Sequence, residues 1–112
     1  MADCIFCKII AGEIAVTPVH RDDDVVVITD INPQAPKHLL AIPVKHVETL
    51  AELSESDPAV TARLMAVAAS TGRSQSPDGF RLVVNTGENG GQTVDHAHVH
   101  ILGGRPMGWP PG

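Results

Sequence analysis

Five consecutive β-branched residues, Val25–Thr29, constrain the fold of this chain more than any other segment. Such residues favour strands, and this run lies between an aspartate cluster and Asn32-Pro33, both typical of turns. We therefore predict a buried strand over residues 25–29. Further strands are predicted over residues 39–44, 80–85 and 96–102. Pro43 cannot donate to a sheet ladder, so it should lie at the end or edge of its strand.

One long helix is predicted over residues 58–71. Apolar residues recur there at helical spacing, Asp57-Pro58 is a plausible start, and Gly72 is a plausible stop. One or two helical turns are expected over residues 5–11, ended by Gly12. Because strands outnumber helices and short turns join them, we predict an α+β fold with an antiparallel sheet of about five strands, one long helix and one short helix.

The length of 112 residues is enough for one domain, residues 1–112, and its composition is that of an ordinary globular protein. The net charge of −5 argues against binding to a nucleic acid polymer, which needs a basic face. A single nucleotide is not excluded, because backbone N–H groups and a few histidines can hold its phosphate.

The sequence contains neither a signal peptide pattern nor a run of 18 apolar residues, so we expect a cytoplasmic protein without a membrane partner. Cysteines stay reduced in that compartment. The two cysteines, Cys4 and Cys7, are separated by two residues. From the residues alone they are a redox pair, buried bystanders or metal ligands.

The run His96-Ala97-His98-Val99-His100 alternates histidine with apolar residues. In a strand, its three imidazoles should project from one solvent-facing surface, while Ala97, Val99 and Ile101 face the core. An imidazole is a good nucleophile toward phosphorus, provided that its other nitrogen donates a proton to a fixed acceptor such as a strand carbonyl. Another histidine can stabilise the phosphate charge or pass a proton to the leaving group. The alternative is a solvated or metal-binding histidine ladder.

The loop before this run contains Gly90 and Gly91, whose backbone N–H groups can approach a phosphate, and Gln92 and Thr93, which add donors. Asn85 is either another donor or a plain turn residue. Glycine-rich loops are common, but next to three histidines this one indicates an anion site.

These residues resemble the histidine triad family, whose signature is His-x-His-x-His followed by two apolar residues, here residues 96–102. The resemblance covers nearly the whole chain, notably residues 30–38, 83–85, 90–93 and 102–112, and points to the Hint branch of purine nucleoside phosphoramidases. It implies hydrolysis of the P–N bond of nucleoside 5′-monophosphoramidates, of adenosine or guanosine, through a nucleotidyl-histidine intermediate. It also implies a two-fold homodimer in which the sheets continue across the interface.

The resemblance implies a role for each matching residue. His98 would be the nucleophile, with His100 and His38 assisting at the phosphate and His96 as a catalytic neighbour. Asp30 would accept hydrogen bonds from the ribose hydroxyls. The remaining nucleotide contacts would be phosphate donors and base-pocket residues: Asn85, Gly91, Gln92 and Thr93 for the former, and Ile5, Phe6, Ile9, Ile14 and Ile28 for the latter.

The resemblance also gives the cysteines a specific role as ligands of a structural zinc ion, together with His46 and His96. Two thiolates and two imidazoles suit tetrahedral zinc. The alternative is two buried cysteines beside a surface histidine. Asp95 departs from the family pattern, because it directly precedes the triad. Its carboxylate there would raise the pKa of neighbouring imidazoles.

The small size of the chain and its apolar helix favour a dimer, since pairing hides exposed apolar surface. We expect Trp109, the only tryptophan, to pack near the partner's active site and to influence the choice of leaving group, although a frayed terminus is the alternative. Two other functions compete with the phosphoramidase: a dinucleoside polyphosphate hydrolase of the same family, and a non-catalytic, zinc-stabilised nucleotide-binding module. The Trp-Pro-Pro-Gly ending favours the phosphoramidase over the first.

Overall fold

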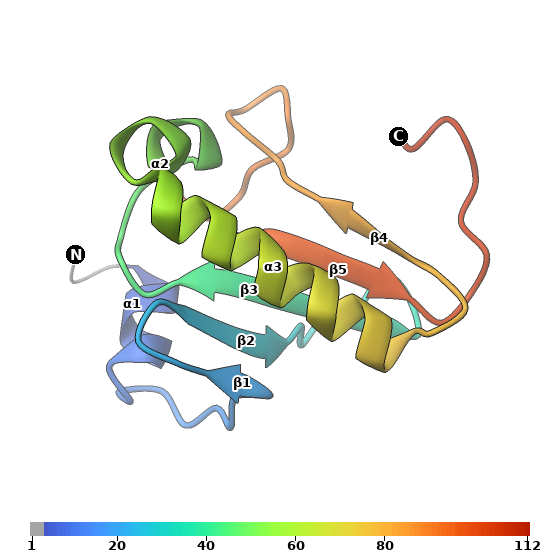
Figure 1. Ribbon diagram of the computed structural model, residues 1–112, viewed down its shortest axis with the longest axis horizontal. Helices are drawn as coiled ribbons and strands as arrows, with labels where there is room; N and C mark the ends of the chain where they lie inside the picture. Colours follow the sequence, from blue (N-terminus) through green and yellow to red (C-terminus); the bar gives the residue numbers. More distant parts are fainter. Residues whose placement is uncertain (1–3) are drawn as a thin grey trace.

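The computed structural model describes residues 4–112, which form one five-stranded antiparallel sheet with helices on both faces (Figure 1). The strands lie in the order β1-β2-β3-β5-β4. In chain order the elements are α1 (Ile5–Ile10), β1 (His20–Arg21), β2 (Val25–Thr29), β3 (Lys37–Pro43), α2 (Leu50–Ser56), α3 (Pro58–Gln75), β4 (Phe80–Val83) and β5 (Val99–Gly103). The predicted α+β class and antiparallel sheet are confirmed.

The two faces of the sheet carry different residues because side chains alternate along each strand. On β3, Leu39 and Ala41 belong to the core under α3, which crosses the sheet in Figure 1. Leu40 and Ile42 belong to a second core with Phe6 of α1. The sheet is therefore buried on both sides over its central strands, which explains why β2 is a continuous apolar run.

The predicted strand ends differ from the observed ones mainly around the site. The strand over residues 25–29 is confirmed as predicted, and Pro43 is the last residue of β3. Because β3 begins at Lys37, the sheet includes His38, which the prediction left outside. The strand predicted over residues 96–102 starts its ladder at Val99, so His96 and His98 precede it.

Two helix predictions were wrong. The helix α2 was missed, and α3 does not stop at Gly72 but continues to Gln75. Gly72 is buried inside α3, where a Cβ would lie 2.4 Å from Cδ2 of Phe80. This glycine makes room for an aromatic ring rather than ending the helix. The short first helix does end before Gly12, which has a φ of +80°.

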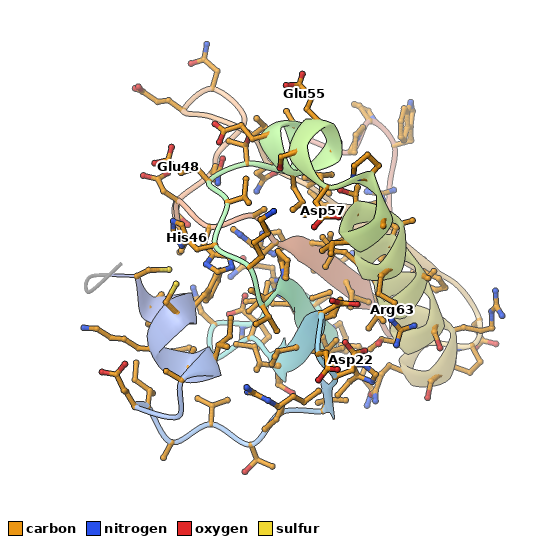
Figure 2. All side chains as sticks on the ribbon, turned by 60° about the vertical axis from the view of Figure 1, so that its left-hand side comes forward. Asp22, His46, Glu48, Glu55, Asp57 and Arg63 are labelled. Atoms are coloured by element: carbon orange, nitrogen blue, oxygen red, sulfur yellow. The ribbon has the colours of Figure 1, made fainter. Side chains whose placement is uncertain are left out.

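The hairpin of β1 and β2 is tied to α3 through Asp22 (Figure 2). Its Oδ2 lies 2.6 Å from Nε2 of His20 and accepts a 2.7 Å hydrogen bond from Nη2 of Arg63. The His20 contact, two backbone N–H groups and Arg63 together hold the pKa of the Asp22 carboxyl well below its usual range. His20 therefore has a structural contact away from the other histidines. Within residues 4–112, no helix has the length and apolarity needed to cross a membrane.

Candidate active site and metal centre

The histidines of the site lie on the face of the sheet opposite α3. His38 on β3 and His100 on β5 are on adjacent strands and on the same face, because Leu40 pairs with His100 and His38 pairs with Leu102. Val99 and Ile101 point the other way into the core under α3, as predicted. Strand alternation therefore places His38 and His100 on one face, while His96 and His98 precede β5.

The expectation that this face is open to solvent is wrong for two of the three triad histidines. His96 and His98 are 0% and 6% exposed. Helix α1 covers them, since the Phe6 ring packs edge-on against both imidazoles, with centroid separations of 5.8 Å to His96 and 5.1 Å to His98. This burial excludes a solvated histidine ladder.

A backbone carbonyl fixes the tautomer of His98. Its Nδ1 lies 2.7 Å from the carbonyl oxygen of His96, and a carbonyl can only accept, so Nδ1 carries the proton and donates it. In the neutral ring Nε2 then has a free lone pair. The carbonyl acceptor that nucleophilic chemistry requires is thus present, and it belongs to His96, which precedes β5.

A chain of hydrogen bonds fixes the protons of His38 and His100. The Gln34 N–H donates to Nδ1 of His38 at 3.0 Å, so His38 carries its proton on Nε2. That nitrogen lies 2.9 Å from Nδ1 of His100 and donates to it. The neutral His100 ring therefore keeps its proton on Nε2. Burial, followed by the nearby His98 and His38, lowers the pKa of His100 and favours this neutral form.

The same proton arrangement opposes a metal ion at Asp30, His38 and His100. Their ligand atoms lie within 4.8 Å of one another, and Oδ2 of Asp30 is 3.4 Å from Nε2 of His38, so the trio has the composition of a two-histidine, one-carboxylate site. A metal on Nε2 of His38 would displace its proton to Nδ1, where the Gln34 N–H already points. Within the trio, His38 therefore donates to His100, with the Asp30 carboxylate beside it.

A second cluster joins α1, the segment after β3 and the triad. Nε2 of His96 donates to the Pro43 carbonyl at 2.8 Å, which leaves Nδ1 free to bind a metal. That Nδ1 lies 3.0 Å from Nδ1 of His46, 3.4 Å from Sγ of Cys4 and 3.7 Å from Sγ of Cys7. Figure 2 shows His46 close to the sulfur atoms at α1.

The separations from the sulfur atoms match a tetrahedral zinc site. With zinc–sulfur and zinc–nitrogen bonds of about 2.3 and 2.0–2.1 Å, ligand atoms should lie about 3.3–3.8 Å apart. The three sulfur–nitrogen distances, 3.3, 3.4 and 3.7 Å, are in this range, whereas the 3.0 Å between the two Nδ1 atoms is shorter. The donors Cys4, Cys7, His46 and His96 therefore fit zinc. Burial lowers the pKa of His96, which suits a neutral ligand, and this is opposite to the increase expected from Asp95.

The loop between β4 and the triad is closed by internal hydrogen bonds. The Gly91 N–H donates to the Glu88 carbonyl at 3.0 Å, and a Cβ at Gly90 would lie 2.3 Å from the Thr86 oxygen. Both amide hydrogens of Gln92 donate to protein carbonyls. Thr93 is exposed and Asn85 is half-buried. Gly90 and Gln92 therefore hold the loop in shape in this structure.

The expected base-pocket residues separate into two groups. Phe6, Ile9 and Ile28 pack in the core on the histidine side of the sheet. Ile5 is 46% exposed, and Ile14 is half-buried. Ile31, which follows Asp30, is 96% exposed.

The tail after β5 contains Trp109, which is 84% exposed. Nη2 of Arg81 on β4 donates to the Gly108 carbonyl at 2.6 Å, which ties the tail to the outermost strand. The tail is therefore attached to β4 at Gly108, next to Trp109, whose ring is exposed to solvent.

Comparisons with known proteins agree with this geometry. A family model described as scavenger mRNA decapping enzyme C-terminal binding matches residues 3–108. An uncharacterized HIT-like protein of Synechocystis is 47% identical over 98% of this chain and 97% of its own length. A 14 kDa zinc-binding protein of Zea mays is 48% identical over 96% of this chain and 87% of its own. The crystal structure of a HIT family hydrolase from Legionella pneumophila has a TM-score of 0.92 and 44% identity, covering 98% of this chain and 100% of that one.

Proposed function

Because the chain belongs to the histidine triad (HIT) family, we propose that it is a nucleotide hydrolase that cleaves the P–N bond of nucleoside 5′-monophosphoramidates. The observation that carries this proposal is the fixed tautomer of His98. Its Nδ1 is committed to the His96 carbonyl, and a neutral Nε2 is the form that attacks phosphorus. The ring of His100, centred 5.0 Å away, keeps a proton on Nε2 for a phosphate oxygen.

The proposed reaction has two displacements at phosphorus. Nε2 of His98 attacks, the P–N bond breaks, and the nitrogen leaves as ammonia or an amine after taking a proton from solvent. The Nε2–H of His100 donates to a phosphate oxygen and stabilises its charge. Water then attacks phosphorus, the bond to His98 breaks, and the nucleoside monophosphate leaves while a proton returns to solvent.

Recognition of the nucleotide would come from the surroundings of the triad. The Asp30 carboxylate lies beside His38, where it would accept hydrogen bonds from the ribose hydroxyls. The exposed Ile31 offers apolar surface for a purine, whereas Phe6 is only 5% exposed and lies against the triad imidazoles. Apolar contacts grip the base without distinguishing its edge, so we expect weak selection between adenine and guanine. Asn85 and Thr93 remain the proposed phosphate donors, whereas the N–H expected from Gly91 already donates to the Glu88 carbonyl.

We also propose that the cluster of Cys4, Cys7, His46 and His96 binds one structural zinc ion. The donor set and spacing support this, as does the similarity to a zinc-binding protein of maize. Bound zinc would cross-link α1 to the triad and supply no reacting group.

The test compares adenosine 5′-monophosphoramidate with diadenosine polyphosphates in parallel. Wild type should release AMP faster from the phosphoramidate and should carry an acid-labile nucleotide label after rapid quenching. His98→Asn should lose both properties, and it is a cleaner test than His98→Ala because His98 is buried. His20→Asn is the matched control, because His20 is paired with Asp22. This variant should retain both AMP release and the nucleotide label.

Each alternative has its own outcome. Faster cleavage of the diadenosine polyphosphates would indicate a dinucleoside polyphosphate hydrolase. Nucleotide binding without cleavage of either substrate would indicate a binding module. Full activity in His98→Asn would overturn the covalent mechanism.

A further inference from the structure

Gln92 makes four hydrogen bonds to other residues of the protein. Its Oε1 accepts from the Gly87 N–H at 3.0 Å, while its own backbone N–H donates to the Gly87 carbonyl at 3.1 Å. Its Nε2 donates to the carbonyls of Glu48 at 2.6 Å and Val94 at 3.0 Å. The amide NH₂ group has two hydrogens, and both are used.

These bonds connect two segments that are distant in sequence. Gln92 and Gly87 close the loop of residues 87–92 on itself, and the bond to Glu48 fixes the closed loop to the segment after β3. Figure 2 shows Glu48 beside His46 at this junction. Glu48 is 44 residues away from Gln92, so this bond fixes the loop relative to the rest of the protein.

Three consecutive residues of that segment contact the triad region. His46 contributes its Nδ1 to the proposed zinc cluster with His96. The Val47 carbonyl accepts from the Ala97 N–H at 2.7 Å, and the Glu48 carbonyl accepts from Gln92. Residues 46–48 therefore form a brace that holds both the triad and the loop before it.

We propose that Gln92 is a positioning residue: it holds the loop of residues 87–91 against the 46–48 brace, so that the loop is already formed when a phosphate arrives. This inference rests on the proposed function, in which that loop lies against the nucleotide phosphate. This role differs from direct contact with the ligand, because the side-chain amide of Gln92 already bonds to other protein residues and need not touch the ligand. A preformed loop lowers the ordering cost of binding.

The decisive measurement is hydrogen exchange in the nucleotide-free, zinc-loaded protein. The amide hydrogens of Gly87, Gly91 and Gln92 all donate within the loop, so their protection reports its closure. Gln92→Leu removes three side-chain hydrogen bonds, and we expect these amides to exchange at least about tenfold faster. The amides of β2 and β3 should keep their wild-type rates. Gln75→Leu, the same change at the far end of α3, should leave the loop unaffected.

A second variant distinguishes the loss of this positioning role from a general loss of folding. Gln92→Glu keeps an acceptor for Gly87 but replaces the NH₂ donor with an oxygen that faces the carbonyls of Glu48 and Val94. We expect the loop to exchange faster in this variant too, with the sheet unchanged. Affinity for AMP should fall about tenfold in both variants, because the loop must then be ordered on binding.

The outcomes distinguish this inference from the function on which it rests. If the loop amides of Gln92→Leu and Gln92→Glu exchange at wild-type rates while AMP binding weakens, Gln92 contacts the ligand directly and the inference is wrong. Wild-type exchange together with wild-type affinity also overturns it. If wild type neither binds AMP nor cleaves a phosphoramidate, the proposed function fails. Faster exchange of the loop amides in the two Gln92 variants would still show that Gln92 positions the loop.

Discussion

At the scale of single residues, His96 belongs to both centres of the molecule. Its imidazole Nδ1 faces the thiols of Cys4 and Cys7, and its carbonyl holds the proton of His98. A backbone carbonyl does not titrate, so the His98 tautomer does not depend on the state of another side chain. Because this carbonyl belongs to His96, any shift of His96 that follows loss of the metal should also move His98, the proposed nucleophile.

Asp30→Ala should weaken AMP binding by about 1.5–3 kcal/mol, the usual value of hydrogen bonds to a charged group. The loss should be much smaller for 2′,3′-dideoxy-AMP, which lacks both ribose hydroxyls. Isothermal titration with the two ligands measures this difference, with the exposed Asp23→Ala as the control. Equal losses for both ligands would show that Asp30 does not contact the ribose.

The lowered pKa of His100 predicts a pH dependence of stability. Its folded-state pKa lies below the usual value of about 6.5, so between these two values the unfolded chain takes up a proton that the folded protein does not. The protonation of His100 thus has no effect on stability above about pH 6.5. As the pH falls from there toward the pKa of His100 in the folded protein, the protein is progressively destabilised. Urea unfolding between pH 7 and pH 5 should show a shallower decrease for His100→Asn than for wild type. Parallel curves would contradict this assignment.

At the scale of secondary structure, α1 depends on contacts with the rest of the protein. It has six residues, and helices this short are not stable alone. Sγ of Cys4 accepts from the Cys7 N–H at its start, and Phe6 is buried against the triad. The metal cluster would therefore anchor the helix that covers His98.

We expect about one zinc ion per chain in protein prepared without added zinc. Cys4→Ser and Cys7→Ser should each remove it and lower the Tm clearly, because they release α1. Metal analysis by mass spectrometry and thermal unfolding measure the two effects, and His20→Asn should bind as much zinc as wild type. Wild-type protein without zinc would remove Cys4, Cys7, His46 and His96 from the list of ligands.

Gly72→Ala should destabilise the fold by about 1–3 kcal/mol, as overpacking does. At an open helix position the same change would stabilise by about 1 kcal/mol, so the sign reports the contact with Phe80. Chemical denaturation measures this. In a Phe80→Ala background the ring is gone and Gly72→Ala should become neutral or stabilising. Destabilisation that persists in that background would show that the ring is not the cause.

Local pattern predicted β2 and β3 well because burial on both faces leaves continuous apolar runs, but it assigned no strand to the two residues of β1. It missed α2, where Leu53 is the one buried residue among polar neighbours. It misjudged Gly72 because the role of that glycine is set by Phe80 in another element. The prediction that His98 faces solvent was wrong for the same reason, since strand alternation does not predict a covering helix. The metal ligands were assigned by family resemblance, and local pattern alone could not have paired His46 with the cysteines.

At the scale of the whole molecule, the sheet has two unequal edges. The edge strand β1 has only two residues, whereas β4 has four, all half-buried, with the Trp109 tail beside it. An open edge strand is a template for pairing with another chain. We propose that β4 lies at the interface of a two-fold homodimer in which the sheet continues.

The tail provides the test of this assembly. Light scattering at micromolar concentration should report a dimer. Deletion of residues 107–112 should change the relative kcat/KM for phosphoramidates with different amine leaving groups more than it changes the Tm. Trp109→Ala should reproduce the change in selectivity. A monomer would contradict the dimer, and unchanged selectivity in both variants would contradict the role of Trp109.

The cluster that joins α1 to the triad also has a consequence for biosynthesis. Cys4 and His96 are 92 residues apart, and the chain is made from its N-terminus. Cys4, Cys7 and His46 are therefore synthesised before the residue that completes their cluster. Until residues 96–98 have left the ribosome, a nascent chain holds neither the complete cluster nor His98, the proposed nucleophile. The proposed catalysis and the retention of metal should thus appear together during synthesis.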